Sequence, residues 1–234
     1  MSQSSVLLEV IATTVADARL AVQAGADRLE LITAMGEGGL TPSLGLIEAV
    51  VADAGCPVNV IVRPHSRNFV FDADDYSVML RDVRAVKAAG AHGVVIGMLT
   101  PDGEIDREGL ARVIDAAEGL AITFHRAFDE TRDQRRALDV LLGFDAVTNV
   151  LTSGGKPSVL HAEATIRALV AQAEGSHCTV LAGAGLTVEA VAGFVQATQV
   201  KAVHFGSGVR RDGNAMAPVD PQRVSRVRSL LDEA

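Results

Sequence analysis

Cysteine and aromatic residues are scarce in this sequence. It has only two cysteines, Cys56 and Cys178, no tryptophan, and 3% aromatic residues. Two cysteines are too few for a disulfide framework, and a chain of 234 residues buries enough apolar surface to fold without one. We therefore expect a reducing, cytoplasmic setting.

Long apolar runs and clusters of positive charge are also missing. Asp, Glu, Arg or Gly interrupts each apolar stretch before it reaches the roughly 20 residues that a membrane helix needs. The first ten residues, MSQSSVLLEV, have no basic region ahead of their apolar run, so no export signal is expected. Lys and Arg number 21 against 29 Asp and Glu, a formal charge of −8, and the cations form no stripe. Nucleic acid and anionic membranes are therefore disfavoured as partners.

Short runs rich in β-branched residues recur along the whole chain, and stretches with helical periodicity separate them. Two such helical stretches are 73–89 and 162–173. The β-branched runs are almost continuously apolar, which is typical of parallel strands covered by helices. We expect eight strands, at 6–10, 28–32, 58–62, 93–97, 121–125, 149–152, 179–182 and 202–205.

The spacing of these units predicts the fold. Eight strand–helix units in 234 residues average about 29 residues each, close to a TIM-type (β/α)8 barrel of roughly 250 residues. Gly25, Gly90 and Gly143 each follow a predicted helix just before a strand, where a left-handed helix stop suits glycine. No linker divides the chain, so we expect a single α/β barrel domain over residues 1–234. An open doubly wound sheet is the alternative, but it usually has fewer strands and one glycine-rich turn.

In such a barrel the functional groups stand at the carboxyl ends of the strands. Glu9 and Glu30 lie in apolar strand contexts, where a charge is costly unless it is paired. We expect Arg63 and Arg126 to be their partners, either in a functional site or in a network that only satisfies the lumen. The candidate catalytic residues are Glu9, Glu30, Arg63, His125 and Arg126.

Histidines divide into two groups. His125 and His204 lie within or at the end of predicted strands, where an imidazole can act as an acid, a base or a metal ligand. The remaining histidines fall in turns or helices, and we expect them on the surface: His65, His92, His161 and His177. Cys56 and Cys178 precede strands and so lie opposite the expected mouth, as small apolar residues.

Several glycine-rich loops follow the predicted strands, where many barrels bind phosphate through backbone N–H groups. Glycine also simply permits a tight turn, and Ser153 also suits a helix cap, so a structural role stays open. The candidate anion-binding residues are Ser153, Gly154, Gly183, Gly185, Gly206 and Ser207.

Several longer motifs resemble the CutC family of copper homeostasis proteins. The matching stretches are LEV at 8–10, GADRLEL at 25–31, EGGLTPS at 37–43, Arg63-Pro64, TFHRAFD at 123–129, LTSG at 151–154 and AGAG at 182–185. The resemblance implies a TIM-type barrel, a cytoplasmic location, a homodimer or higher homo-oligomer, and a role in copper handling. Many relatives carry cysteines invoked for Cu(I) where this chain has Ile11 and Ile32. The segment 65–69 also departs from the family pattern.

Three functions therefore stay open. The first is copper handling, with His125 and His204 as the nitrogen ligands of Cu(I). The second is an isomerase- or lyase-like enzyme acting on a small phosphorylated or carboxylated metabolite. A non-catalytic binding module is the third, and the expense of keeping buried charges argues against it.

Overall fold

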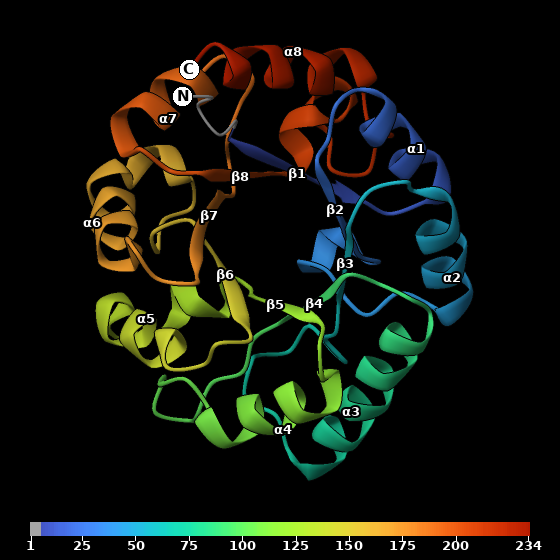
Figure 1. The fold of residues 1–234 in the computed structure, drawn as a ribbon, viewed down its shortest axis with the longest axis vertical. Helices are drawn as coiled ribbons and strands as arrows, with labels where there is room; N and C mark the ends of the chain where they lie inside the picture. Colours follow the sequence, from blue (N-terminus) through green and yellow to red (C-terminus); the bar gives the residue numbers. More distant parts are fainter. Residues whose placement is uncertain (1–5) are drawn as a thin grey trace.

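The computed structural model describes residues 6–234 and shows a closed barrel of parallel strands surrounded by helices (Figure 1). Neighbouring strands pair in sequence order, and β8 pairs with β1 to close the ring. The strands are β1 (Leu7–Ala12), β2 (Arg28–Leu31), β3 (Val58–Ile61), β4 (Gly93–Ile96), β5 (Ala121–Phe124), β6 (Val147–Thr152), β7 (Thr179–Gly183) and β8 (Ala202–Phe205). The predicted (β/α)8 barrel is confirmed.

An α-helix follows each strand and covers the outside of the barrel. The helices are α1 (Val15–Gln23), α2 (Leu44–Asp53), α3 (Ala73–Ala88), α4 (Arg107–Ala117), α5 (Gln134–Leu142), α6 (Glu163–Ala173), α7 (Val191–Thr198) and α8 (Pro221–Asp232). Most begin after a Thr, Ser or Asp side chain that accepts a free N–H of the first turn. At α3, Asp72 and Asp75 form a reciprocal capping box. Among the helices of residues 6–234, none is long and apolar enough to span a membrane.

The predicted strand positions agree with the structure to within two residues, and small differences remain at their ends. The first strand continues to Ala12, and the sixth begins at Val147. Gly25 and Gly90 take the expected left-handed conformation, with φ of 104° and 82°. Gly143 has a φ of −77°, so that part of the prediction is wrong: the chain leaves α5 in a right-handed conformation that any residue could adopt.

Alternation along the strands sends one set of side chains toward the helices and the other into the barrel lumen. The lumen holds two apolar clusters, one built around Leu7, Leu151 and Leu181 and the other around Ile32, Ile61 and Val95. On β1, Glu9 lies between Leu7 of one cluster and Ile11, which packs against the other. A polar layer is buried in the lumen alongside these clusters: Glu9, Arg28, Glu30, Asn59, Thr123, Asn149 and His204. TIM barrels are usually filled with branched apolar side chains, so this layer is unusual.

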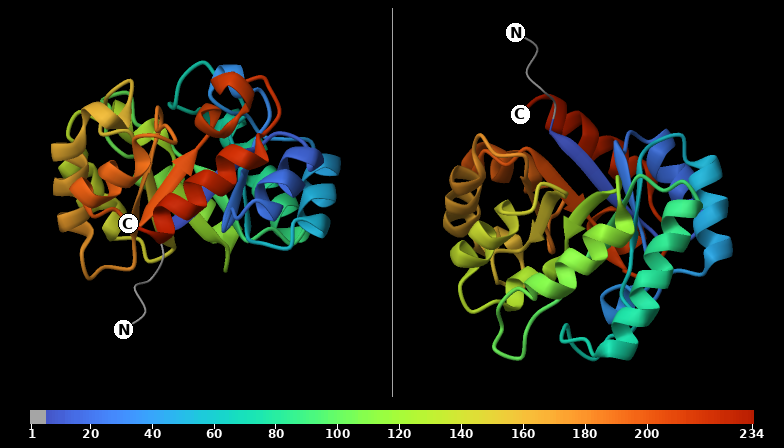
Figure 2. Two further views of the ribbon diagram at one scale, coloured as in Figure 1. Left: turned by 90° about the horizontal axis from the view of Figure 1, so that it is seen from above. Right: turned by 60° about the horizontal axis from the view of Figure 1, so that its bottom comes forward.

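Within the described residues 6–234, five short 3-10 helices lie in the loops: η1 (Met35–Glu37), η2 (Arg126–Glu130), η3 (Val159–His161), η4 (Ser207–Val209) and η5 (Arg211–Gly213). The loops that follow β2, β3 and β8 rise together over one side of the barrel (Figure 2). The Ser66 hydroxyl donates to the Glu37 carboxylate, and a side chain at Gly206 would touch Met35. These loops therefore form one wall of the mouth.

Both cysteines lie at the opposite end of the barrel, as predicted. They are free thiols, Cys178 buried and Cys56 half-buried. Burial raises the pKa of Cys178 to about 12, and burial together with the nearby Asp27 raises that of Cys56 to about 11. Neither thiol is therefore poised to ionise near neutral pH.

Candidate functional site

The mouth of the barrel contains a cavity of about 400 Å³ at the carboxyl ends of the strands. Its polar lining includes Glu30, Arg63, His125, Arg126 and His204. Its apolar lining comes mostly from β1, β2, β3 and the loops after them, and includes Ile11, Ile32, Met35, Ile61 and Phe69. The cavity is large enough for a small metabolite.

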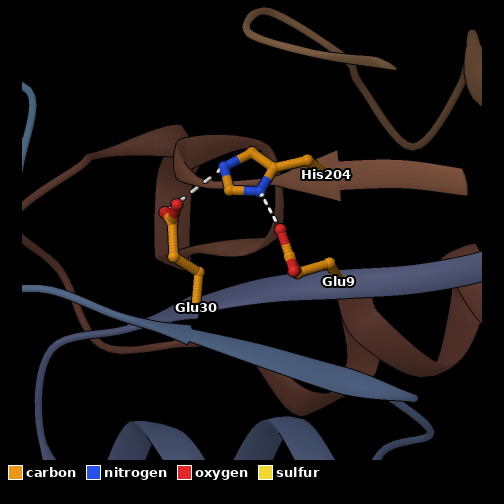
Figure 3. Close-up of side chains that lie close together, drawn as sticks. All are labelled: Glu9, Glu30 and His204. Carbon is orange, nitrogen blue, oxygen red and sulfur yellow. Dashed lines mark hydrogen bonds and ion pairs between the residues drawn. The ribbon is translucent and has the colours of Figure 1, made fainter. Parts of the chain in front are cut away.

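One imidazole joins two buried carboxylates at the floor of this cavity. His204, on β8, has Nδ1 2.8 Å from Oε1 of Glu9 on β1, and its Nε2 lies 3.8 Å from Oε2 of Glu30 on β2 (Figure 3). All three side chains are at least 93% buried. Glu30 and His204 line the cavity, whereas Glu9 lies behind them.

The environment separates the pKa values of these three groups. Burial, together with the charge of Glu9, raises the pKa of Glu30 to about 7, although His204 and Arg28 act in the other direction. Burial also opposes ionisation of Glu9, but Arg28 and His204 outweigh it and lower the pKa of Glu9. Glu30 and Glu9 raise the pKa of His204 against the effect of burial. At neutral pH Glu30 is therefore the carboxyl that can gain or lose a proton.

Arg28 is the ion-pair partner of Glu9, so the predicted pairing with Arg63 or Arg126 is wrong. The two residues are register partners on β1 and β2, and Arg28 Nε donates to Oε2 of Glu9. Arg28 Nη1 donates to Asn149 Oδ1 at 3.0 Å across the lumen. Sequence reasoning missed Arg28 because it looked only at strand ends. The alternation Arg28-x-Glu30 does signal that both side chains face the lumen.

Arg63 follows β3 and is held by backbone carbonyls rather than by a carboxylate. Its guanidinium donates to the carbonyls of Glu37, Gly39 and Ser66 at 3.2–3.3 Å and lies 4.6 Å from the ring centre of Phe69. The residue is 6% exposed, and burial lowers its pKa. Its Nε is buried without a hydrogen-bond partner among the described residues.

His125 follows β5, and a backbone N–H two residues further along the chain sets its tautomer. The N–H of Ala127 donates to Nδ1 at 3.1 Å, so a neutral ring carries its proton on Nε2. Burial, with the charges of Arg63 and Arg126, lowers the pKa of His125 to about 3. Its Nε2 has no hydrogen-bond partner within residues 6–234. The ring therefore stays neutral across the physiological range.

Arg126 pairs with Asp129, a residue that the sequence prediction missed. Arg126 Nε donates to the Asp129 carboxylate at 2.8 Å. The same carboxylate accepts the N–H groups of Ser153 and Gly155, and the Thr152 hydroxyl. An internal anion therefore already occupies the loop after β6. Ser153 and Gly154 also lie outside the lining of the cavity, so an external anion would have to displace Asp129 there.

The loops after β7 and β8 lie differently from the loop after β6. Gly185, Gly206 and Ser207 line the cavity, as an anion site requires. Gly183 does not: a Cβ there would lie 3.1 Å from the Cβ of His204, so this glycine makes room for the imidazole. Half of the predicted anion-binding residues therefore face the cavity.

The metal site at His125 and His204 stays a prediction: both line the cavity, and among the described residues His125 belongs to no group of three possible ligands. His204 lies with Glu9 and Glu30, and these three offer ligand atoms within 4.8 Å of one another. Both oxygens of Glu9 are already engaged, by His204 and Arg28. Among the histidines predicted at the surface, His92, His161 and His177 are exposed. His65 is half-buried instead, because its Nε2 contacts the Asp75 carboxylate at 3.2 Å.

Comparison with known proteins places these residues in one family. The model of the CutC family matches residues 6–209. A family protein CutC of Caulobacter vibrioides is 40% identical over 243 aligned residues, which cover 100% of this chain and 97% of the relative. A solved structure named as a copper homeostasis protein CutC, from Streptococcus agalactiae, has a TM-score of 0.79 at 30% identity and covers 85% of this chain and 97% of its own. A phosphoribosyl anthranilate isomerase of Thermococcus kodakaraensis, with a TM-score of 0.63 at 15% identity over 96% of this chain and 98% of its own, shares the fold alone.

Proposed function

The chain belongs to the CutC family, and from that membership and the geometry of its mouth we propose that it is an enzyme acting on a small anionic metabolite. The reaction is a proton transfer of the isomerase or lyase type. The metabolite carries a phosphate or a carboxylate and binds in the cavity at the carboxyl ends of the strands.

The observation that carries this proposal is the contact between His204 and two glutamates at the floor of a cavity. Glu30 lines the cavity beside this imidazole, where a bound molecule can reach it. Its pKa of about 7 suits a group that both takes and returns a proton at neutral pH. Glu9 stays ionised and holds His204 in place. Separated pKa values in neighbouring groups are typical of acid–base sites.

Two arginines of the lining support an anionic ligand, although the carboxylates of Glu37, Asp129 and Glu130 also line the cavity. Arg63 is buried at the cavity wall and has an Nε with no partner among the described residues. Arg126 lines the same cavity, although Asp129 offsets part of its charge. The loops at Gly185 and Ser207 add backbone N–H groups from the opposite arc of the mouth. These groups would position a charged substrate over Glu30.

A ligand-binding screen with variants tests this proposal. Phosphorylated and carboxylated metabolites of two to six carbons are tested for an increase in Tm, starting with 2-phosphoglycolate. We expect stabilisation that Arg63→Lys and Arg126→Ala weaken. Arg67→Ala is the matched control, because Arg67 lies on the same loop with a side chain 70% exposed. Stabilisation unchanged in both arginine variants, or absent for every metabolite, would reject the anion site.

Copper handling is the second candidate, and the family name supports it. Among residues 6–234, the only soft donor in the lining of the cavity is the Met35 thioether, and the imidazoles in that lining are His125 and His204. Ile11 and Ile32 line the mouth, and both thiols lie at the far end of the barrel. His125 also points Nδ1 at the Ala127 N–H, so it would have to give up that bond or the proton on Nε2. These residues fit Cu(I) poorly, and the metabolite is the better supported ligand.

A further inference from the structure

We propose that His125 is a catalytic hydrogen-bond donor to the carbonyl oxygen of an α-hydroxy aldehyde or ketone, and that Glu30 moves a proton between the two adjacent carbons. This inference rests on the proposed function and names its substrate class. It assigns His125 neither the role of a base nor that of a metal ligand.

The chain fixes His125 as a donor through Nε2. The Ala127 N–H occupies Nδ1 from two residues away, so rotation of the ring would lose that bond. Gly97 packs against the other side: a Cβ at that position would lie 2.4 Å from both Cε1 and Nδ1 of His125. The Phe69 ring lies 5.0 Å from the imidazole centre. The ring is therefore held in one orientation, with its N–H on the side that has no protein acceptor among residues 6–234.

A buried N–H without an acceptor destabilises the site, so a ligand that supplies an acceptor binds more tightly. Arg63 lines the same cavity, and Phe69 packs against both Arg63 and His125. The Arg63 Nε is likewise buried without a partner in the described chain. One wall of the cavity thus offers an imidazole N–H and a guanidinium, which together suit an oxygen that gains negative charge.

The same lining also holds the proton carrier. Glu30 and His204 come from β2 and β8, whereas Arg63 and His125 follow β3 and β5, and all four side chains line one cavity. A carbonyl compound bound between them directs its oxygen to His125 and its adjacent C–H to Glu30. Neutral imidazole is suited to this role because its N–H matches a developing enediolate better than a charged imidazolium does.

The reaction balances without any further reactant. Glu30 takes the proton from the carbon that bears the hydroxyl group, and the C–H electron pair forms the carbon–carbon double bond of an enediolate. The former carbonyl oxygen gains negative charge, which His125 Nε2–H and Arg63 stabilise. The hydroxyl proton passes to that oxygen, and Glu30 returns its proton to the former carbonyl carbon. An aldehyde thereby becomes a ketone, or the reverse.

Deuterium exchange tests the reaction directly. Dihydroxyacetone phosphate, ribulose 5-phosphate and fructose 6-phosphate are incubated with the protein in D2O, and ¹H NMR follows loss of the C–H signals beside the carbonyl. We expect exchange with at least one of them, reduced about 10²- to 10⁴-fold by Glu30→Gln. His125→Ala loses most of the rate, and His125→Gln recovers part of it, because the amide again offers an N–H. His161→Ala, at an exposed histidine, leaves the rate unchanged.

Two further measurements keep the outcomes distinct. If 2-phosphoglycolate binds by calorimetry but none of the three sugars exchanges, the enediolate reaction is overturned while the anionic metabolite site stands. If nothing binds, both proposals fail. Histidine ¹⁵N NMR of the unmutated protein reads the tautomer without any variant: a proton on Nδ1 of His125, or a charged ring at pH 6, overturns the donor role.

Discussion

Nδ1 of His204 lies 2.8 Å from Oε1 of Glu9, although 195 positions separate the two residues along the chain. Only closure of the barrel brings them together, because β1 and β8 are its first and last strands and Glu9 and His204 are register partners. The same imidazole faces Glu30 at 3.8 Å. The acid–base cluster is therefore complete only when the barrel is closed.

Glu30→Gln should make the protein more stable at alkaline pH. The pKa of Glu30 is about 7 in the folded protein and ordinarily about 4.5, so the folded state binds the proton more tightly than the unfolded state. This stabilisation is complete below about pH 4.5 and is lost as the pH rises through about 7. His204, whose pKa is raised, acts with the same sign. We expect the variant to exceed the wild type by about 1–3 kcal/mol at pH 8 in urea unfolding.

The control for this variant is Glu48→Gln, at an exposed position on α2. It should change neither the stability at pH 8 nor its slope with pH. Equal slopes for the wild type and Glu30→Gln between pH 6 and 8 would mean that Glu30 ionises normally despite its burial between His204, Glu9 and Arg28.

His125→Asn should reduce the loss of folding stability that accompanies a fall in pH from about 6 to 4. The pKa of His125 is about 3 in the folded protein and ordinarily about 6.5, so its stabilising contribution is lost as the pH falls from about 6.5 towards 3. The cause is burial beside Arg63 and Arg126. We expect the wild type to lose up to about 1.4 kcal/mol per pH unit from this group. Unfolding curves at pH 4, 5 and 6, with His161→Asn as the exposed control, measure the difference, and identical acid limbs in all three proteins would contradict it.

Much of the fold was predictable because strand and helix periods are local properties. Runs such as 93–97 and 179–182 are mostly apolar on both faces, which is typical of a covered parallel strand, and all eight strands were found. The mouth residues Glu30, Arg63, His125, Arg126 and His204 followed from the fold, since strand ends converge there. The cytoplasmic location and the homo-oligomer stay predictions.

The pairings could not be predicted, because they depend on register across the closed barrel. Arg28 lies at the start of its strand and reaches Glu9 only through the β1–β2 register. Asp129 follows β5 in a short 3-10 helix, and no local pattern says that its carboxylate fills the loop after β6. The tautomer of His125 likewise depends on the backbone path at Ala127. These are contacts between loops and strands that sequence spacing leaves undetermined.

The buried pair of Arg28 and Glu9 should show strong energetic coupling. Arg28→Met leaves the fully buried Glu9 carboxylate without its cation, and we expect a loss of about 3–5 kcal/mol. Glu9→Gln in the same chain should recover part of that loss, since no unpaired charge remains. A double-mutant cycle measures the coupling, with the exposed pair Lys87 and Glu118 as the matched control at about 0–1 kcal/mol. Additive losses at Arg28 and Glu9 would mean that water already screens the lumen.

Asp129→Asn should loosen the loop after β6 without unfolding the barrel. The carboxylate accepts N–H bonds from Ser153 and Gly155, and an amide that replaces one oxygen by a donor faces those N–H groups unfavourably. We expect a loss of about 1–3 kcal/mol and faster amide exchange at 153–155. Asp139→Asn, on the exposed face of α5, is the control. Unchanged protection of these amides would show that the loop holds itself in place.

A Cu(I) titration tests whether this chain binds copper, as the name of its family suggests. Under anaerobic, reducing conditions the protein competes with a coloured Cu(I) chelator, and we expect no stoichiometric site. Met35 is the only soft donor that the described part of the chain gives to the cavity lining, and Cys178 is buried with a raised pKa. The double variant Ile11→Cys, Ile32→Cys is the positive control, since both side chains line the mouth and pack against one cluster. It should gain a site. A site in the wild type that Met35→Leu or the pair His125→Ala, His204→Ala removes would instead make copper the ligand of this mouth.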